Sequence, residues 1–373
     1  MTTTRTGSRS ALADASGYSL IEMMVATGIT TVVMAVTMTG LADVSKGSEM
    51  VLNMTAMNKA LRSGMDLLER DMLQVGSGLP PGHVILVPSG VGSTPIRLPG
   101  PPGTAFTSVA GDPDISAVQP SAGLGPTING HATDVLTVLM ADNAFLNVTV
   151  TAVTATTVDV SPTVGGVPLN IATGPDRVSP GQLMMISRQS STALEQVTSV
   201  DYGTRRITFA DGDSLNLNQS GAAAGNLAAI NRLAPANSII GVQLTRIRMI
   251  TYYLDATIDP KHPRLVRRIN NGSPTAFDNT SGTAVAMDIE NLTFSYDLND
   301  GNTNPSGVRM TLTDQGPAGS CAPNPCSTNQ IRKVDIVITA RSSNINNPKA
   351  RSFHNTLASQ VSFRGMAFVD EYK

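Results

Sequence analysis

The residues with the most distinctive chemistry lie near the N-terminus, in GYSLIEMMVATGIT (residues 17–30). Glu22 is followed by twenty residues without a formal charge. A carboxylate in such a run costs about 2.5–3.5 kcal/mol even on permissive membrane-insertion scales, so it normally has a cationic partner. No Lys or Arg lies within two helical turns of it in the sequence. Cleavage after Gly17 would create such a cation, the α-amino group of Tyr18. We expect a neighbouring chain to supply this amine, because a helix carries its own N-terminus away from Glu22.

The uncharged run predicts a membrane span. Residues 23–42 would extend about 30 Å as a helix, which is the thickness of a bilayer core. Arg5 and Arg9 precede the run and predict a cytoplasmic N-terminus. A secretory signal peptide ends in an A-x-A type of cleavage site, and TMTGLADVSKG at the far end contains no convincing one. The order of segments therefore favours a single-span anchor.

Two cysteines, Cys321 and Cys326, lie close together in CAPNPC. In an oxidising compartment such a pair forms one local disulfide, and in a reducing one it stays as two free thiols in a loop. A metal site would need further ligands, and no histidine lies nearby in the sequence. We expect the disulfide.

The chain shows no recognisable catalytic motif. G-x-S-x-G, H-E-x-x-H, the P-loop and the dinucleotide fingerprint are all absent, and the acids form no recognisable acid/base pair. The four histidines have no metal-ligand spacing, and each is expected to be a loop or surface residue: His83, His131, His262 and His354. We therefore expect a protein that is not an enzyme and has no cofactor.

The loop DLNDGNTNPSG holds oxygen-bearing side chains at residues 297–304, which is the type of ligand that Ca²⁺ prefers. The EF-hand spacing fails, because Pro305 stands at the glycine position and Thr311 at the position of the closing glutamate. A solvated turn is the favoured interpretation. RLVRR, with Arg264, Arg267 and Arg268, is expected to be an exposed strand face rather than a ligand site.

The composition argues against a nucleic-acid partner and favours a β-rich domain. The chain has 373 residues, 14% charged residues and a formal net charge of −2. There is no basic surplus to bind a nucleic-acid backbone. Low charge with many Thr, Val and Gly residues is typical of a loop-rich β domain outside the cytoplasm.

After the span, the pattern predicts an amphipathic continuation of the helix. An apolar stripe recurs at helical spacing, and the helix is expected to stop near VGSGLPPG, where Gly and Pro cluster. The stripe comprises Met50, Met54, Met57, Leu61, Met65, Leu68, Met72 and Val75. It should pack under the rest of the chain.

Residues 77–373 predict a β-rich, loop-rich head. Runs that read as strands include DVLTVLMA, GQLMMIS, IRMITYYLD, RLVRRI, NLTFSYDL, GVRMTLT and IRKVDIVITARSS. Residues 80–130 are rich in Pro, Gly and Ser and are expected to form a loop-rich insertion. SGAAAGNLAAINRL predicts a short helix. The fold class is therefore α+β.

The N-terminal stretch resembles the class III signal of type IV pilins and of type II secretion pseudopilins. The resemblance rests on a glycine, an aromatic residue, SLIE and an uncharged span, in that order. It implies cleavage between Gly17 and Tyr18 by a prepilin peptidase, N-methylation of Tyr18, and pairing of Glu22 with the N-terminus of an adjacent subunit. The departures are Tyr18 in place of the commoner Phe, a seventeen-residue leader, and Thr39 where major pilins often have proline.

Segments of the head, among them LRSGMDLLERDMLQVGSG and AMDIENLTFSYDLNDG, resemble PilW-type minor pilins and the J-type pseudopilins. The resemblance implies a leader (1–17), a transmembrane and filament-core helix (18–42), an amphipathic continuation (43–76) and a pilin-like head (77–373). It implies a structural subunit that helps to prime a type IV pilus.

The partners implied are prepilin peptidase, other minor and major pilins, the inner-membrane assembly platform and membrane lipid. The expected location is the inner membrane with a periplasmic head, followed by the pilus at the cell surface. A J-type pseudopilin of a type II secretion system remains the alternative. A membrane-anchored periplasmic enzyme or binding head is a further one.

Overall fold

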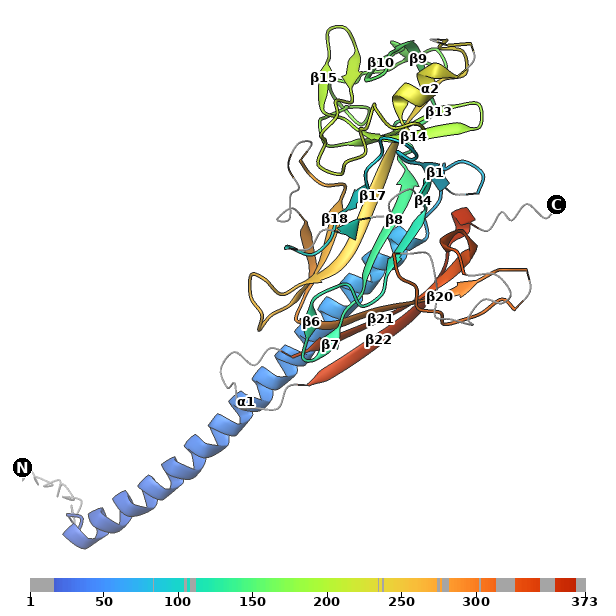
Figure 1. Ribbon diagram of the computed structural model, residues 1–373. Coiled ribbons are helices and arrows are strands. Elements are labelled where there is room, and N and C mark those ends of the chain that lie inside the picture. Colours follow the sequence, from blue (N-terminus) through green and yellow to red (C-terminus); the bar gives the residue numbers. More distant parts are fainter. Residues whose placement is uncertain are drawn as a thin grey trace, which may run out of the picture. The chain divides into compact units, whose positions relative to one another are not determined.

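The structure, a computed structural model, describes residues 17–82, 84–103, 106–107, 112–233, 235–236, 238–273, 276, 282–301, 303–312, 326–342 and 353–366. Figure 1 labels its elements along the chain. The chain divides into two compact units, residues 1–54 and residues 55–373, and each is described by itself.

The described part of the first unit, residues 17–54, belongs almost entirely to α1 (Leu20–Met72), whose last residues lie in the second unit. At 1.5 Å per residue, the 53 residues of this helix span about 80 Å. Its side chains from Leu20 to Leu52 are exposed on all sides. The helix contains no proline, and it ends four residues before Gly76, which has a φ of 75°.

In the second unit, α1 buries one face. The buried apolar residues of this face are Met57, Leu61, Met65, Leu68 and Met72. Val75, three residues beyond the end of the helix, is also buried. Gly64 lies on the same face, and a Cβ there would be only 3.2 Å from the side chains of Ala286 and Leu265. The glycine therefore allows the helix to approach β18 (Arg264–Ile269) and β19 (Thr283–Met287) closely.

A buried acid ties the end of α1 to the strands below it. Asp71 accepts hydrogen bonds from Tyr252 Oη at 2.6 Å and from Arg267 Nε at 2.6 Å. Arg267 Nη2 reaches the second carboxylate oxygen of Asp71 at 3.1 Å, so the pair is bidentate. Burial, and then the Asp71 carboxylate, raise the pKa of Tyr252, which keeps its hydroxyl a donor.

The large sheet is organised around one long strand, β17 (Gln243–Asp255). Its first half pairs with β13 (Leu183–Arg188), and its second half pairs with β8 (Val135–Ala141) on one side and β18 on the other. Figure 1 shows β17 and β8 side by side. All these pairings are antiparallel. β17 can serve several neighbours because it is thirteen residues long and almost wholly buried.

A second, three-stranded antiparallel sheet has the order β20 (Ile289–Leu298), β21 (Ile331–Arg341) and β22 (His354–Ser362). Buried residues alternate along β20 and β21, as expected for strands with one covered face. That face shares a core with α1 and with β8, β17 and β18. Asn355 Nδ2 donates to Asn58 Oδ1 at 2.6 Å, and Ser359 Oγ donates to Glu69, so β22 also contacts the helix directly.

Shorter elements complete the described part of the second unit. Seven further strands extend the large sheet beyond β17, β13, β8 and β18, and the head contains two more apolar cores. The remaining strands are β1 (Val84–Leu86), β2 (Arg97–Leu98), β3 (Phe106–Thr107), β4 (Asp114–Ser116), β5 (Val118–Ser121), β6 (Thr127–Ile128), β7 (His131–Ala132), β9 (Val148–Val153), β10 (Thr157–Val160), β11 (Thr163–Val164), β12 (Val167–Pro168), β14 (Ser191–Gln196), β15 (Ser199–Asp201) and β16 (Arg206–Thr208). The short helices are α2 (Leu227–Arg232), η1 (Thr328–Gln330) and η2 (Arg364–Met366).

The α+β class and the short helix predicted after residue 220 are confirmed. Asn226 caps α2 by accepting the N–H of Ala229 at 2.7 Å. The expectation of an exposed arginine face on β18 is wrong. Arg264 binds Asp255 at 2.7 Å, Arg267 binds Asp71, and Arg268 is buried. The acid that binds Arg264 lies on the neighbouring strand, the acid that binds Arg267 is far away in the sequence, and Arg268 donates to Asn271, so all three side chains have partners inside the fold.

Replacing Asp71 by alanine should lower the free energy of unfolding by about 3 kcal/mol, because Arg267 and the hydroxyl of Tyr252 would lose their acceptor in a largely buried place. The matched control is Asp66→Ala, at an exposed position of the same helix, which should change it by less than about 0.5 kcal/mol. Urea unfolding followed by circular dichroism measures both. Equal losses in the two variants would contradict the role of Asp71.

Candidate functional site

The start of α1 places Glu22 in a capping box. The N–H of Ser19 donates to Glu22 Oε2 at 2.9 Å, and the N–H of Glu22 donates to Ser19 Oγ at 3.2 Å. The S-x-x-E pattern at residues 19–22 is the sequence signature of this motif. The side chain of Glu22 thus reaches back to the N–H of Ser19, the residue after Tyr18.

Glu22 has no ion-pair partner in the part of the chain that the structure describes. Oε2 holds the Ser19 N–H, and Oε1 is open to a further donor. Gly17 and Tyr18 precede the helix and are exposed, and no heavy atom lies within 4 Å of a Cβ built on Gly17. The structure thus brings the three predicted N-terminal site residues into one accessible segment.

The hydroxyl groups of the uncharged run are satisfied within the helix itself. Each of its five threonines donates Oγ1 to the carbonyl oxygen four residues earlier, at 2.7–3.1 Å: Thr27, Thr30, Thr31, Thr37 and Thr39. With the backbone bonded along the helix as well, the run offers no unsatisfied donor to its surroundings.

This run meets the physical requirements for crossing a membrane. α1 contains an 18-residue window of mean hydropathy 1.8, and none of that window is buried within the protein. A helix that is apolar on all sides needs either lipid or other helices around it. Among the described residues, α1 is the helix long and apolar enough to span a bilayer.

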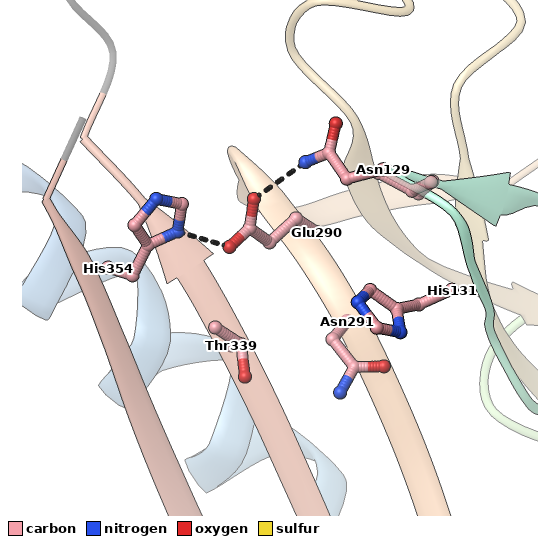
Figure 2. A pocket seen from close by; sticks show the side chains of 7 residues that line it. Asn129, His131, Glu290, Asn291, Thr339 and His354 are labelled. Carbon is pink, nitrogen blue, oxygen red and sulfur yellow. Dashed lines mark hydrogen bonds and ion pairs between the residues drawn. The ribbon is translucent and has the colours of Figure 1, made fainter. Parts of the chain in front are cut away.

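A pocket in the head is lined by titratable side chains. Its volume is about 340 Å³, and its lining includes Glu290, His131 and His354. Figure 2 shows the Glu290 carboxylate between Asn129 and His354, with His131 beside Asn291. Asn129 Nδ2 donates to Glu290 Oε2 at 2.9 Å, and His354 Nδ1 contacts Oε1. Both oxygens of Glu290 therefore have partners.

Among the residues that the structure describes, the other predicted candidates are not assembled into a metal centre. His262 Nδ1 lies 2.6 Å from Asp288 Oδ1 at the end of β19, whereas His83 lies outside the described residues. Across the described ranges, no group of three or more His, Cys, Asp or Glu residues is arranged to hold a metal ion. Asp300 in the candidate calcium loop accepts Thr303 Oγ1 and the N–H of Asn304, both at 2.8 Å, as in a self-bonded turn.

Cys326 is buried and disulfide-bonded. Its predicted partner, Cys321, lies outside the described residues. The residues that follow Cys326 lead into η1 and then β21, where Ser327 and Gln330 form a second capping box. The bridge thus lies at the entry to the central strand of the three-stranded sheet.

Two buried acids that the sequence analysis did not single out accept hydrogen bonds from backbone N–H groups. Glu195 Oε1 accepts the N–H of Leu227 at 2.7 Å, at the start of α2. Asp213 accepts the N–H groups of Leu215, Leu217 and Asn218 at 2.7–3.1 Å. Burial raises the pKa of both carboxyl groups. Their hydrogen bonds to loop and helix N–H groups mark them as structural residues.

Comparisons of the chain with family models, with curated proteins and with solved structures found no match in any of the three.

Replacing Glu195 by glutamine should stabilise the head at pH 8 and have little effect near pH 4. Burial raises the pKa of Glu195 well above 4.5, with Asp213 and Asp211 adding to the effect and the Leu227 N–H opposing it. The folded state therefore holds a proton that the unfolded state releases, so the wild-type protein loses stability as the pH rises above 4.5. Glutamine keeps an acceptor for Leu227 and does not titrate.

Thermal unfolding of both proteins between pH 4 and pH 8 measures this difference. The gap between their midpoints should widen steadily with pH. A variant that is destabilised by the same amount at every pH would show that the charge of Glu195 is not what matters.

Proposed function

We propose that this chain is a structural subunit of a filament assembled from the inner membrane: a PilW-type minor pilin that helps to prime a type IV pilus. The observation that carries the proposal is the position of Glu22. This acid stands at the first turn of a helix whose next twenty residues carry no charge, directly after an exposed Gly17–Tyr18 segment.

The first step of the mechanism is removal of residues 1–17 by a prepilin peptidase. A protease needs an extended and accessible substrate, and residues 17–19 precede the helix and are exposed. The cut would leave the amine on Tyr18, which the resemblance predicts to be methylated.

The second step is charge pairing during assembly. The capping box holds the Glu22 carboxylate towards the N-terminal end of its own helix and leaves Oε1 open. An amine brought by a neighbouring subunit can bind there, and in a bilayer such a pair removes the cost of an isolated carboxylate. At the same distance the attraction is much stronger in lipid than in water, because the dielectric constant of lipid is far lower, so it favours docking of adjacent subunits within the membrane.

The third step is an exchange of lipid for protein around α1. The apolar side chains of residues 23–42 are exposed all round, and the threonine hydroxyls are already bonded. The helix can therefore pass from lipid into a bundle of like helices without breaking a hydrogen bond. The head, built on the second part of α1, would be carried out with it.

The same features would suit a J-type pseudopilin, since both classes share this N-terminal segment. A membrane-anchored enzyme is less well supported, because the pocket at Glu290 contains an acid whose two oxygens are already bonded. Deleting the gene for this chain in its own cells distinguishes the minor pilin from the pseudopilin. Loss of pili supports the minor pilin, and loss of protein secretion supports the pseudopilin.

Replacing Gly17 by valine should block processing, because the peptidase would meet a branched side chain at the bond to be cut. A Cβ at Gly17 meets nothing within 4 Å, so the substitution should not disturb folding. The control is Gly28→Ala, which lies inside the span with equally open surroundings and should be processed normally.

Mass spectrometry of the proteins purified from their own cells measures the outcome. The wild-type chain should begin at N-methyltyrosine 18, and the Gly17→Val chain should retain residues 1–17. A wild-type protein that still begins at Met1 would refute the proposed cleavage.

Replacing Glu22 by glutamine should permit processing and reduce assembly at least tenfold. Glutamine can still accept the Ser19 N–H, so the cap survives while the charge is lost. The matched control is Ser19→Ala, which keeps the charge and removes the hydroxyl acceptor at a cost of about 1 kcal/mol to the helix start. It should assemble nearly normally.

Counting pili, or the amount of this subunit in sheared filaments, tests the two variants in cells that lack other copies. If Ser19→Ala fails and Glu22→Gln assembles, the helix cap matters and the proposed charge pair does not.

A further inference from the structure

The short helix α2 packs on one face of the hairpin that β13 and β14 form (Figure 1). The apolar residues of this face and of α2 belong to one core and are at most 1% exposed: Met184, Ile186, Ala193, Leu227 and Ile230. A helix of six residues is not stable in water by its own hydrogen bonds. The order of α2 therefore depends on what holds it against the hairpin.

A buried acid of β14 holds the start of α2. Glu195 Oε1 accepts the N–H of Leu227 at 2.7 Å, and Glu195 is 2% exposed. Glu195 lies two residues from Ala193, so both side chains point from β14 to the face that α2 covers. The bond gives a partner to one of the N–H groups that the first turn of a helix leaves unsatisfied.

A buried base of β13 holds the other end of α2. Arg188 Nη1 donates to Leu233 O at 2.8 Å and to Ile230 O at 3.2 Å. Nη2 of the same side chain donates to Pro235 O at 2.8 Å, and Arg188 is 1% exposed. A guanidinium group is not deprotonated in proteins, so the bonds at this end do not depend on pH.

Glu195 faces two further acids, Asp211 and Asp213, from the loop that follows β16. Within the described residues, none of the three carboxyl groups belongs to an ion pair. Asp213 accepts three backbone N–H groups, and Asp211 accepts the N–H and the hydroxyl of Ser220. An ionised Glu195 would thus add a negative charge beside two others.

The basic residues of the elements packed around Glu195 bind other groups. Arg188 binds the far end of α2, and Arg232, the charged residue of α2, donates to a backbone carbonyl oxygen at 3.2 Å. Arg246 lies in the same cross-strand row, two strands away on β17, and pairs with Asp142 at 2.8 Å. β1, which also contacts β14, contains no charged residue.

Docking of α2 and protonation of Glu195 therefore favour each other. Burial, the largest cause, raises the pKa of Glu195 well above 4.5, while the Leu227 N–H opposes this and Asp213 and Asp211 add to it. When α2 is undocked, water reaches the carboxyl group and its pKa returns towards the ordinary value. The undocked state then binds fewer protons, so docking is strongest at low pH. It weakens as the pH rises from 4.5 through the raised pKa of the docked state.

We propose that α2 is a pH-dependent flap: it undocks from the β13–β14 face when Glu195 ionises, while the sheets beneath it stay folded. The proton passes to water, and Arg188 keeps its charge in both states. Undocking uncovers the apolar face at Met184, Ile186 and Ala193. The inference concerns the head by itself and is independent of the proposed function.

The test is hydrogen exchange of the full chain in detergent micelles at pH 5 and pH 8, measured by mass spectrometry. Protection factors, in which the intrinsic pH dependence of amide exchange is divided out, report local opening. The protection factor of residues 227–233 should fall at least about tenfold from pH 5 to pH 8, because one unit of pKa shift changes the docking equilibrium tenfold. That of residues 135–141, in β8, should stay unchanged.

Variants identify the group that titrates. Glu195→Gln keeps an acceptor for Leu227 and does not ionise, so its residues 227–233 should be equally protected at both pH values. The control is Asp201→Asn, at an exposed acid on β15 of the same sheet, which should keep the wild-type fall. If Glu195→Gln does not fold, Asp211→Asn, at an exposed position, removes one neighbouring charge and should make the fall smaller.

Three results would each overturn the proposal. An equal loss of protection in residues 135–141 would mean that the whole head opens. Constant protection of residues 227–233 in the wild-type chain would mean that α2 does not undock. A wild-type fall in Glu195→Gln would assign the pH dependence to another group. Cleavage at Gly17 and assembly through Glu22 affect none of these readings.

Discussion

The apolar surface of α1 between Met23 and Ala42 has to be kept out of water. This constraint determines which surroundings the N-terminal part of the protein needs. The side chains of this segment are exposed on all sides, and nothing in the described part of the first unit covers them. Only lipid or other helices can do so. The threonines bond to their own backbone, which makes the segment equally suited to both surroundings. Glu22 is the charged residue that directly precedes this segment, and its carboxylate accepts the N–H of Ser19.

The second part of the same helix packs against the head. Residues 57–72 bury a single face against two sheets, and they are fixed by a polar contact at the end of the helix. Asp71 binds side chains from both β17 and β18, so it ties the helix to the central strand of the large sheet and to its neighbour. The position of the helix in the head is thus determined by both packing and charge.

Much of the fold could be predicted from local pattern. The run RLVRRI matches β18, and the apolar stripe of α1 is buried from Met57 onward. The partners of charged residues could not be predicted, because Arg267 and Asp71 are 196 positions apart in the sequence. β22 was missed because its alternating residues are small and weakly apolar, and it is held by pairing with β21 rather than by its own burial.

The candidate sites also differ in how far local sequence order could predict them. The proposed roles of Gly17, Tyr18 and Glu22 rest on their order and on the uncharged run that follows. The capping box was equally readable from S-x-x-E, but it answers a question of helix geometry rather than of charge. In the head, Glu290 and His354 are 64 positions apart, so no spacing rule could place them in one pocket.

The contact between Asn58 and Asn355 has a consequence for the synthesis of the protein. The two residues are 297 positions apart, and the chain must be almost complete before β22 can reach the helix. At about 5–20 residues per second, that interval is roughly 15–60 s. During this time Leu61, Met65 and Leu68 lack part of the core that finally covers them, so the newborn chain exposes apolar surface until its last strand emerges.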